Sequence, residues 1–515
     1  MARLALLSTS DKTGLIEFAQ TLVKEFEFDL ISSGGTAKVL KEAGLSVTKV
    51  SDYTGFPEIL GGRVKTLHPR IHGGILARRD VPEDLKELET HEIRPIDLVV
   101  VNLYPFEQTI AKEGVTLAEA IENIDIGGPT LLRASAKNYA HLTVLCNPEQ
   151  YPQYLEQFRQ NQGDISLEFR QNCALKAFRH TATYDQAISA YLQQQETPKD
   201  TPLPALYSLS GTELQSLRYG ENPHQPATWY QTGTVATGWA AGKILQGKPL
   251  SYNNLVDLEA ARRIISEFPD EPAAAVLKHT NPCGVAMGNS LSEAYKKAFA
   301  ADSVSAFGGI VALNRPIDAD TATALTTTFL ECIVAPGCTP EAEEILQKKS
   351  KLRVLILPDL IRGPSETVKV IAGGFLVQTS DDAVENPQDW KVVTEKQPTP
   401  EQLAELLLAW KVVKHVKSNA IVVTKNRTTL GVGAGQMNRV GSVKIALEQA
   451  GENAKGGYLA SDGFFPFDDS VRTAADAGIT AIVQPGGSVR DEDSIKAANE
   501  LGVIMVLTGM RHFLH

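Results

Sequence analysis

Residues 96–103 read IDLVVVNL, an apolar run with three consecutive valines. A run of this kind predicts a strand that is buried on both faces of a parallel sheet. Strand and helix patterns alternate around it: strands are expected at residues 3–8, 28–32 and 142–146, and helices at 13–25, 36–43 and 130–137, the last with Pro129 at its first position. The alternation predicts a doubly wound α/β domain.

The chain has 515 residues, a length that suggests two to four domains. Residues 193–204 (QQQETPKDTPLP) combine glutamines, prolines and charges without an apolar period, which is typical of a linker. We therefore expect a first domain at residues 1–198 and a second region at residues 199–515.

Composition argues against several functions. The formal net charge of -11 disfavours a nucleic-acid partner bound through bulk charge. The sequence has no run of about 18 apolar residues, so we expect no membrane span, and its first apolar stretch is too short for a signal peptide. The five cysteines are odd in number and form no CxxC pair, which indicates neither a disulfide framework nor a zinc knuckle. These features predict a cytoplasmic protein.

The second region contains two segments that are weakly similar in sequence. Residues 275–286 read AVLKHTNPCGVA and residues 413–423 read VKHVKSNAIVV, each followed by a glycine-rich turn, FGGIVALN at Phe307 and GVGAGQMNR at Gly431. Two copies of one α/β fold would produce this pattern. Chance similarity between strand-turn segments explains it about equally well.

Two turns of the first domain are suited to phosphate. Residues 8–14 and 32–36 join a strand to a helix and are rich in Ser, Thr and Gly. A helix N-terminus exposes unpaired N–H groups and the positive end of a dipole, and both favour an anion. Ordinary turn and cap chemistry selects the same residues, and for either turn alone it is the better explanation.

The segment at residues 61–74, GGRVKTLHPRIHGG, strengthens the phosphate interpretation. It places five basic side chains between two Gly-Gly pairs. Arg63 can grip a phosphate with two hydrogen bonds and Lys65 can add a point charge. A metal site at His68 and His72 lacks a carboxylate at ligand spacing and is discounted. Ligands of such sheets bind at the carboxyl ends of strands, where we expect Ser33, Arg63, Lys65, Asn102, Tyr104 and Asp125 to gather.

Three segments of the second region carry further chemistry. Lys278-His279 follows an apolar strand and offers a cation beside a base that titrates near neutral pH. Taken alone, this dipeptide is better explained as an ordinary pair of surface residues than as a catalytic pair. Residues 218–225 (RYGENPHQ) form a dense polar loop. The phenylalanines of residues 464–469 (FFPFDD) either belong to the core or stack on the flat ring of a ligand.

The motifs together resemble a known family. SDKTGL at Ser10, SGGTA at Ser33, GGRVKTLHPRIHGGIL at Gly61, NLYPF at Asn102, DIGG at Asp125, LRYGENPHQ at Leu217, LKHTNPCG at Leu277, FGGIVALN at Phe307, KSNAIV at Lys417, GAGQMNR at Gly433 and SDGFFPFD at Ser461 are similar, in order, to the bifunctional purine biosynthesis proteins. That family joins AICAR transformylase to IMP cyclohydrolase: it transfers a formyl group to AICAR, giving FAICAR, and then closes the FAICAR ring to IMP.

The resemblance implies a methylglyoxal-synthase-like first domain followed by two tandem cytidine-deaminase-like α/β units without zinc. It implies 10-formyltetrahydrofolate as the formyl donor, no tightly bound cofactor, and a homodimer in which both subunits contribute to the transformylase site. We expect small-molecule substrates, no nucleic acid and no membrane.

The resemblance also assigns residues. For the cyclohydrolase site it implies Ser10, Lys12, Ser33, Thr36, Arg63, Lys65, Thr66, Asn102, Tyr104, Asp125, Gly127 and Lys137, with Lys65, Tyr104, Asp125 and Lys137 as catalytic candidates. For the transformylase site it implies Lys278, His279 and Asn419 as the catalytic group, nucleotide contacts at Arg218, Tyr219, Phe307, Gly308, Glu331, Arg439, Phe464 and Arg511, and folate contacts at Phe467 and Asp469.

Two other functions are compatible with the first domain alone. One is a sensor that binds a phosphorylated regulator, and the other is a lone methylglyoxal-synthase-like lyase. Neither explains the Lys278-His279 pair or the FFPF segment.

Overall fold

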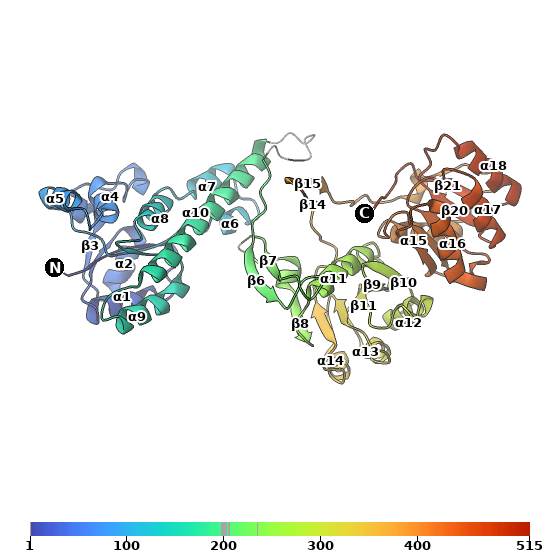
Figure 1. Ribbon diagram of the computed structural model, residues 1–515, viewed down its shortest axis with the longest axis horizontal. Helices are drawn as coiled ribbons and strands as arrows, with labels where there is room; N and C mark the ends of the chain where they lie inside the picture. Colours follow the sequence, from blue (N-terminus) through green and yellow to red (C-terminus); the bar gives the residue numbers. More distant parts are fainter. Residues whose placement is uncertain (1, 197–202, 204–205, 234) are drawn as a thin grey trace. The chain divides into compact units, whose positions relative to one another are not determined.

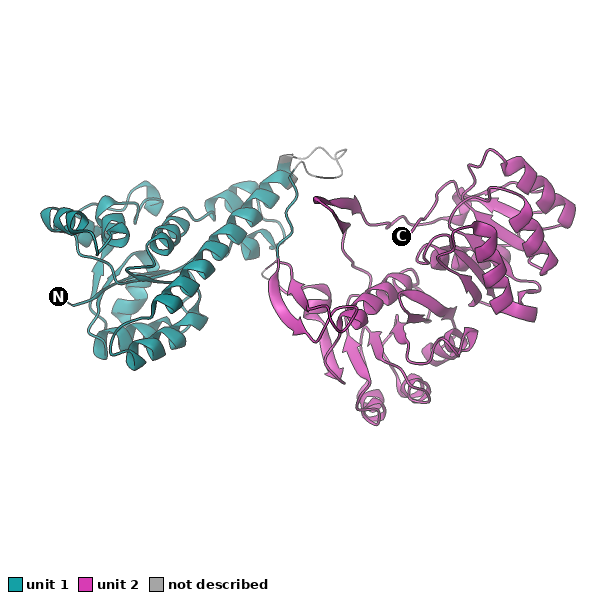
Figure 2. Ribbon diagram, viewed as in Figure 1, with its two compact units in different colours: residues 1–210 teal, residues 211–515 magenta. Residues whose placement is uncertain are grey.

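The computed structural model describes residues 2–196, 203, 206–233 and 235–515, which form two compact units, residues 1–210 and 211–515 (Figure 2). The predicted linker begins inside a long helix, α10 (Leu167–Glu196), so its first four residues are helical. Glutamine is a good helix former, so the missing apolar period did not mark the end of the helix. Most of the remaining linker lies outside the described residues, and the boundary at 198/199 stays a prediction.

The first unit is built on a parallel five-stranded sheet. Its order is β3-β2-β1-β4-β5, formed by β1 (Leu4–Thr9), β2 (Asp29–Ser32), β3 (Val47–Lys49), β4 (Leu98–Asn102) and β5 (Thr143–Leu145). Val99, Val100 and Val101 are each at most 1% exposed, which confirms the buried parallel strand predicted from IDLVVVNL. The strand order reverses between β1 and β4, and such a switch point opens a crevice at the carboxyl ends of the strands.

Helices cover this sheet in the predicted alternation (Figure 1). The helices of the unit are α1 (Leu15–Lys24), α2 (Gly34–Glu42), α3 (Val50–Thr54), η1 (Leu60–Gly62), α4 (Pro69–Leu76), α5 (Pro82–Thr90), α6 (Phe106–Ile110), α7 (Leu117–Glu122), α8 (Gly127–Lys137), η2 (Pro148–Gln150), α9 (Tyr151–Gln160) and α10. The predicted start of α8 was wrong by two residues, because the helix begins at Gly127 and Pro129 is its third residue. A proline is tolerated there, since the first-turn N–H groups have no partner within the helix.

The second unit contains a twelve-stranded sheet made of two equivalent halves. The first half runs through β6 (Thr212–Leu217), β7 (Ala227–Gln231), η3 (Gly238–Ala241), β8 (Lys243–Gln246), α11 (Tyr252–Ile265), β9 (Ala273–Lys278), β10 (Asn281–Met287), α12 (Leu291–Ala301), β11 (Ile310–Leu313), α13 (Ala319–Leu325), β12 (Cys332–Ala335), α14 (Pro340–Gln347) and β13 (Arg353–Ile356). Within the large sheet this half has the order β10-β9-β11-β12-β13-β8.

The second half repeats this order of elements. It runs through β14 (Glu366–Ile371), β15 (Gly374–Thr379), η4 (Pro387–Asp389), β16 (Lys391–Val392), α15 (Pro400–Val413), β17 (Ile421–Lys425), β18 (Thr428–Gly433), α16 (Arg439–Ala450), η5 (Gly451–Ala454), β19 (Tyr458–Ser461), α17 (Asp469–Asp476), β20 (Ala481–Gln484), α18 (Asp491–Leu501) and β21 (Ile504–Leu507). Its sheet order, β18-β17-β19-β20-β21-β16, matches the first half strand for strand, and β10 pairs with β18 to join the halves.

The topology therefore contains the predicted duplication, but the segments that suggested it do not correspond. Residues 275–286 cover the β9–β10 hairpin, whereas residues 413–423 cover the end of α15, a loop and the start of β17. The structural equivalent of the first segment is the β17–β18 hairpin. Gly284 and Gly431 mark this equivalence, because a Cβ on either would lie 1.9 Å from a helix carbonyl, that of Ala298 or Ala446.

Candidate functional sites

A pocket of about 590 Å³ opens at the switch point of the first sheet. It collects the polar residues expected there from the carboxyl ends of β1, β2 and β4 and from the loops beyond them. Of the twelve residues assigned to the cyclohydrolase site, eleven line it: Ser10, Lys12, Ser33, Thr36, Arg63, Lys65, Thr66, Asn102, Tyr104, Asp125 and Gly127. The sequence motifs, which are scattered over more than a hundred residues, therefore meet in one cavity.

Asn102 fixes the floor of this pocket at the end of β4. Its Oδ1 accepts the backbone N–H groups of Ser10 and Asp11 at 2.6 and 2.8 Å, and its Nδ2 donates to the carbonyl of Asp11 at 2.9 Å. Thr36 similarly ties α2 to β1, because its hydroxyl both accepts from the N–H of Thr9 and donates to the carbonyl of Thr9 at 3.0 Å. These bonds set the two phosphate-type turns beside each other.

The electrostatics of the pocket favour an anion. The N-termini of α2 and α8 both reach it through Gly34 and Gly127, and each adds the positive end of a helix dipole. Lys12, Arg63 and Lys65 add cationic side chains. Arg63 pairs with Glu122, and Lys65 lies 3.7 Å from Glu58, so a carboxylate orients each of these two cations.

Asp125 is the less exposed of the two carboxylic acids that line this pocket. Its Oδ1 accepts the N–H of Gly128 at 2.8 Å, and its own N–H donates to the hydroxyl of Tyr184 at 2.8 Å. Burial raises the pKa of the Asp125 carboxyl, and the backbone N–H groups around it and the charge of Lys65 only partly offset that effect. Position 128 requires glycine, because a Cβ there would lie 2.4 Å from the Asp125 Oδ2 atom.

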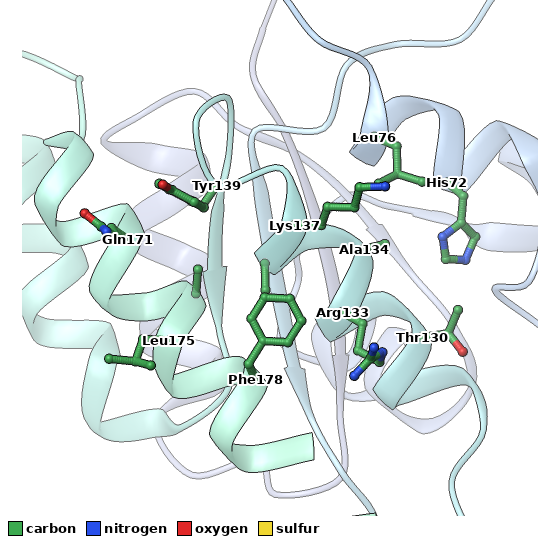
Figure 3. Close-up of a pocket in the computed structure, with 12 residues that line it drawn as sticks. His72, Leu76, Thr130, Arg133, Ala134, Lys137, Tyr139, Gln171, Leu175 and Phe178 are labelled. Atoms are coloured by element: carbon green, nitrogen blue, oxygen red, sulfur yellow. The ribbon is translucent and has the colours of Figure 1, made fainter. Parts of the chain in front are cut away.

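Lys137 is placed apart from this group. It stands at the last residue of α8, whereas Gly127 in the pocket is the first, about 15 Å away along the helix axis. Lys137 lines a different cavity, of about 780 Å³, with His72, Arg133 and Phe178 (Figure 3). Burial lowers the pKa of His72 there. Within one chain, the structure does not bring Lys137 to the other cyclohydrolase candidates.

In the second unit, Lys278 and His279 stand at the β9–β10 hairpin. Lys278 ends β9 and donates from Nζ to the carbonyl of Phe307 at 2.9 Å. His279 and Thr280 form the two-residue turn, with φ angles of 53° and 65°. A left-handed conformation is uncommon for such residues, and the N–H of Thr280 is held by the Asp257 carboxylate of α11 at 2.7 Å. The hairpin therefore presents the histidine from a fixed backbone.

The loops around the hairpin carry the expected nucleotide contacts. Phe307 is 57% exposed, and its ring lies 5.5 Å from that of Phe329. The N–H of Gly308 donates to the carbonyl of Phe329 at 2.9 Å. Glu331 is held at 2.7 Å by Arg353, which is itself largely buried. The loop of the exposed Phe307 ring is thus bound directly to Lys278, and the Glu331 carboxylate is oriented by Arg353.

Asn419 belongs to a second polar cluster, on the loop before β17. Its Oδ1 accepts from Arg439 at 2.7 Å and its Nδ2 donates to the carbonyl of Gln436 at 2.7 Å. Arg439 is buried and pairs with the fully buried Asp462. The loop reaches the hairpin of the first half, because the N–H of Lys417 donates to the side chain of Asn281 at 3.3 Å. Lys278, His279 and Asn419 therefore lie on connected segments.

The FFPF segment combines one core phenylalanine with two exposed ones, and the stacking role of the exposed pair stays a prediction. Phe465 is fully buried in the core, whereas Phe464 and Phe467 are 39% and 50% exposed. The guanidinium of Arg490 lies 5.2 Å from the centre of the Phe467 ring, and Asp469 begins α17 nearby. Arg218 lies over the Tyr219 ring at 5.5 Å, and Arg511 lies over Phe513 at 4.6 Å.

Sequence motifs gave no indication of several contacts that hold these sites. Asp257 orients the hairpin from α11, Arg353 orients Glu331, and Asp462 anchors Arg439. Each lies outside a recognisable motif of its partner and meets it only through the fold. A carboxylate in the middle of an amphipathic helix, such as Asp257, has no local signal that separates it from an ordinary surface acid.

The α/β fold combines an anion pocket at the switch point of one sheet with a lysine–histidine hairpin in a duplicated second unit, an arrangement typical of an enzyme. Comparison with known proteins agrees. Residues 135–449 match the family described as AICARFT/IMPCHase bienzyme, and residues 14–130 match the MGS-like domain.

Curated relatives match over the whole length. Proteins called bifunctional purine biosynthesis protein PurH from Nostoc punctiforme, Gloeothece citriformis and Rippkaea orientalis are 75%, 74% and 72% identical, each over 100% of both chains. A solved chain titled crystal structure of ForH is 35% identical over 38% of this chain and 100% of its own, with a TM-score of 0.36. The chain belongs to the AICARFT/IMPCHase family of bifunctional purine biosynthesis enzymes.

Proposed function

We propose that the two activities are divided between the units, with formyl transfer to AICAR in the second and ring closure of FAICAR to IMP in the first. These are the last two steps of purine synthesis, the reactions of the family. The observation that carries the division is the placement of Lys278, His279 and Asn419 on connected segments of one unit, and of the anion pocket wholly in the other.

Formyl transfer needs help with a weak nucleophile. The amine of an aminoimidazole carboxamide is delocalised into its ring, so positioning and proton removal must contribute heavily. In our proposal His279 removes that proton, directly or through the neighbouring carboxamide. Lys278 stabilises the oxyanion that forms at the formyl oxygen or assists departure of the folate nitrogen as the C–N bond to it breaks. Asn419, oriented by Arg439, aligns the reacting groups.

Substrate contacts follow from the same geometry. Arg218 and Arg511 supply cations for the ribotide phosphate. Flat surfaces for the base come from two pairs of residues, Phe307 with Gly308 and Tyr219 with Phe464. Glu331 accepts a hydrogen bond from the ribose. The formyl donor, 10-formyltetrahydrofolate, is implied by the transferase activity. The exposed ring of Phe467 and the carboxylate of Asp469 fit a flat pterin with an N–H edge. We propose no tightly bound cofactor and no zinc.

Ring closure joins the carboxamide nitrogen to the formyl carbon and then loses water. Ser10, Ser33, Thr36, Thr66 and the N-termini of α2 and α8 bind the phosphate with Lys12 and Arg63. Asp125 receives the proton of the attacking nitrogen. Lys65 and Tyr104 stabilise the oxyanion and then protonate the resulting hydroxyl group, which leaves as water. Lys137 remains a candidate for this reaction, although it lines a separate cavity within one chain.

We propose a cytoplasmic homodimer that binds neither nucleic acid nor membrane. The hairpin β14–β15 supports a protein partner, because Val370 and Leu376 on it are 83% and 56% exposed. All five cysteines are free, which fits a reducing compartment. No helix among the described residues is both long enough and apolar enough to cross a membrane.

The direct test is to mix the purified chain with AICAR and 10-formyltetrahydrofolate and to follow IMP by absorbance and chromatography. We expect IMP with both substrates, and FAICAR to be converted to IMP without folate. Failure of the second reaction in an otherwise active protein would contradict the proposed pocket.

A further inference from the structure

The formyl-transfer site has a structural counterpart in the second half of the same unit. Lys278 is the last residue of β9, and Lys425 is the last residue of β17. The turns that follow, His279-Thr280 and Asn426-Arg427, both have positive φ angles, 53° and 65° in one and 53° and 60° in the other. The duplication has thus preserved an unusual backbone conformation and the lysine before it.

The elements around the two hairpins also correspond. Asp257 is the sixth residue of α11 and Glu405 the sixth of α15, and each carboxylate accepts the N–H of the second turn residue at 2.7 Å. Gly308 and Gly456, with φ angles of 72° and 74°, stand two residues before β11 and β19. Asn419 and Glu271 each stand two residues before the strand that leads into the hairpin.

This counterpart surrounds a cavity of about 660 Å³. Its lining includes Glu271, Glu405, Lys425, Asn426 and Gly456, the residues that correspond to Asn419, Asp257, Lys278, His279 and Gly308. The two halves exchange their contributions. In this cavity the second half supplies the hairpin and the loop before β9 of the first half supplies one wall, whereas beside the Lys278 hairpin the loop before β17 takes that place. The cavity is therefore the symmetry mate of the formyl-transfer site.

The chemistry of the cavity differs from that of its mate at the decisive position. Asn426 replaces the base His279, and an amide cannot take up a proton near neutral pH. The cations are engaged locally: Lys425 donates to the carbonyl of Lys455 at 2.6 Å, and Arg427 pairs with Glu271. The equivalent site thus lacks the base that a transfer reaction would need.

What remains is suited to binding a flat polar ring. Phe268, Met287, Leu408 and Tyr458 line the cavity and supply apolar surface. Glu405 uses Oε1 for the Arg427 N–H, while its Oε2 is buried without a hydrogen-bond partner among the described residues. A buried polar atom that lacks a partner favours a ligand that supplies one.

We propose that this cavity is a second small-molecule site, which binds a flat nitrogen heterocycle carrying a primary carboxamide or a ring lactam and performs no chemistry on it. Such a group donates an N–H and accepts through C=O on one edge. A carboxyl at Glu405 complements that edge, and burial raises its pKa so that the neutral acid, which can both donate and accept, is more accessible. The comparison of this cavity with the Lys278-His279 site rests on the proposed function, because the catalytic roles of those two residues belong to that proposal.

The test counts bound molecules per chain. The probe is the unphosphorylated riboside of 5-aminoimidazole-4-carboxamide, measured by equilibrium dialysis against the full-length protein. Ala404→Trp fills the cavity from α15. Val256→Trp, at the equivalent fifth residue of α11, places the same bulk beside Asp257 in the formyl-transfer half. Met287→Trp fills the cavity from β10 and decides the result if the first variant does not fold.

We expect Ala404→Trp and Met287→Trp to bind one probe molecule fewer per chain than the unsubstituted protein, with formyl transfer to AICAR changed by no more than about two-fold. Val256→Trp should lose formyl transfer while the cavity still binds the probe. Inosine is a second probe and tests whether the cavity binds a ring lactam. Aminoimidazole riboside lacks the carboxamide, so Ala404→Trp and wild type should bind the same number of its molecules per chain. Unchanged probe stoichiometry in folded Ala404→Trp or Met287→Trp would overturn the second site; loss of transfer in His279→Ala tests the proposed function separately.

Discussion

Asp257 accepts the backbone N–H of Thr280 across a distance of 2.7 Å. The bond joins the middle of α11 to the hairpin turn that presents His279, whose own φ angle is 53°. Burial raises the pKa of the Asp257 carboxyl, while the N–H groups of the turn and the neighbouring His279 act in the opposite direction. We infer that Asp257 is a positioning residue for formyl transfer, and that its equivalent, Glu405, provides an internal control.

Replacing Asp257 by alanine should lower kcat for formyl transfer by about 10- to 100-fold, because a displacement of His279 by about 1 Å is sufficient to cost that much. Asp257→Asn keeps an acceptor oxygen and should recover most of the rate. Glu405→Ala removes the matching bond from the Asn426-Arg427 turn and should leave the rate nearly unchanged. Equal losses in the two alanine variants would mean that the bond serves stability alone.

His279→Ala should lower formyl transfer by at least ~100-fold, the lower range for loss of a general base. Ring closure of added FAICAR should be nearly intact, because every described residue that lines the cyclohydrolase pocket belongs to the other unit. Both rates are measured on one preparation, so that misfolding shows as a joint loss. Transfer within a few-fold of wild type would remove His279 from the mechanism.

Ring closure should depend on the protonation of Asp125. Burial raises the pKa of this carboxyl above its ordinary value of 3.8, so the acid form persists to higher pH than in solution. A base must be ionised to act, and the rate should therefore rise with pH through that raised pKa. The measurement is kcat/KM for FAICAR from acid to neutral pH, in wild type and in Asp125→Asn.

Asp125→Asn should abolish this acid limb together with most of the activity. The asparagine oxygen can still accept a hydrogen bond from the N–H of Gly128, and the variant has no charged carboxylate for burial to disfavour. The free energy of unfolding at neutral pH should therefore not fall. An active Asp125→Asn enzyme with an unchanged pH profile would contradict the assignment.

A fragment ending at residue 198 should fold and close the FAICAR ring without transferring formyl groups. It keeps the five-stranded sheet, the whole anion pocket and all of α10, which packs against α8 and β5. The matched control ends at residue 166 and lacks α10, whose Cys173, Ala174 and Ala177 belong to the core, and it should not fold. A folded 1–198 fragment that fails to produce IMP would show that ring closure needs the second unit or a second chain.

His512 should make the second unit more stable below neutral pH than above pH 9. Burial alone would lower the pKa of this histidine, but hydrogen bonds from its two ring nitrogens to Asp381 and Glu385 outweigh burial and raise the pKa to about 9 from 6.5. The stabilisation is complete below the unfolded value and is lost as the pH rises through the folded value.

The expected size of this effect is at most about 3 kcal/mol, and less because Asp381 is half exposed and its charge is screened. Urea unfolding between pH 6 and 9.5 measures it. The decline in unfolding free energy over that interval should be flatter in His512→Gln, and an identical slope in both proteins would rule the histidine out as its source.

Much of the first unit could be predicted from local sequence. Strand β4 was recognisable because a parallel strand buried on both faces needs an unbroken apolar run. The anion pocket was predictable because the carboxyl ends of parallel strands meet at one edge, so turns such as Ser32–Thr36 and Asp125–Gly128 had to converge. Helix ends were less certain: α8 begins two residues before the predicted start, since first-turn positions accept several residue types.

The sequence by itself determined the family, the α/β class, and the residue types at both sites, because these depend on contiguous motifs such as GGRVKTLHPRIHGG and LKHTNPCG. Only the tertiary structure decided which residues meet. It separated Lys137 from Asp125, joined Asp257 to the His279 turn, and placed Glu405, Lys425 and Asn426 at positions equivalent to Asp257, Lys278 and His279. The physical reason is that duplicated halves preserve backbone geometry and hydrogen bonds after side-chain similarity has been lost, and such relationships are defined by distances between segments far apart in the chain.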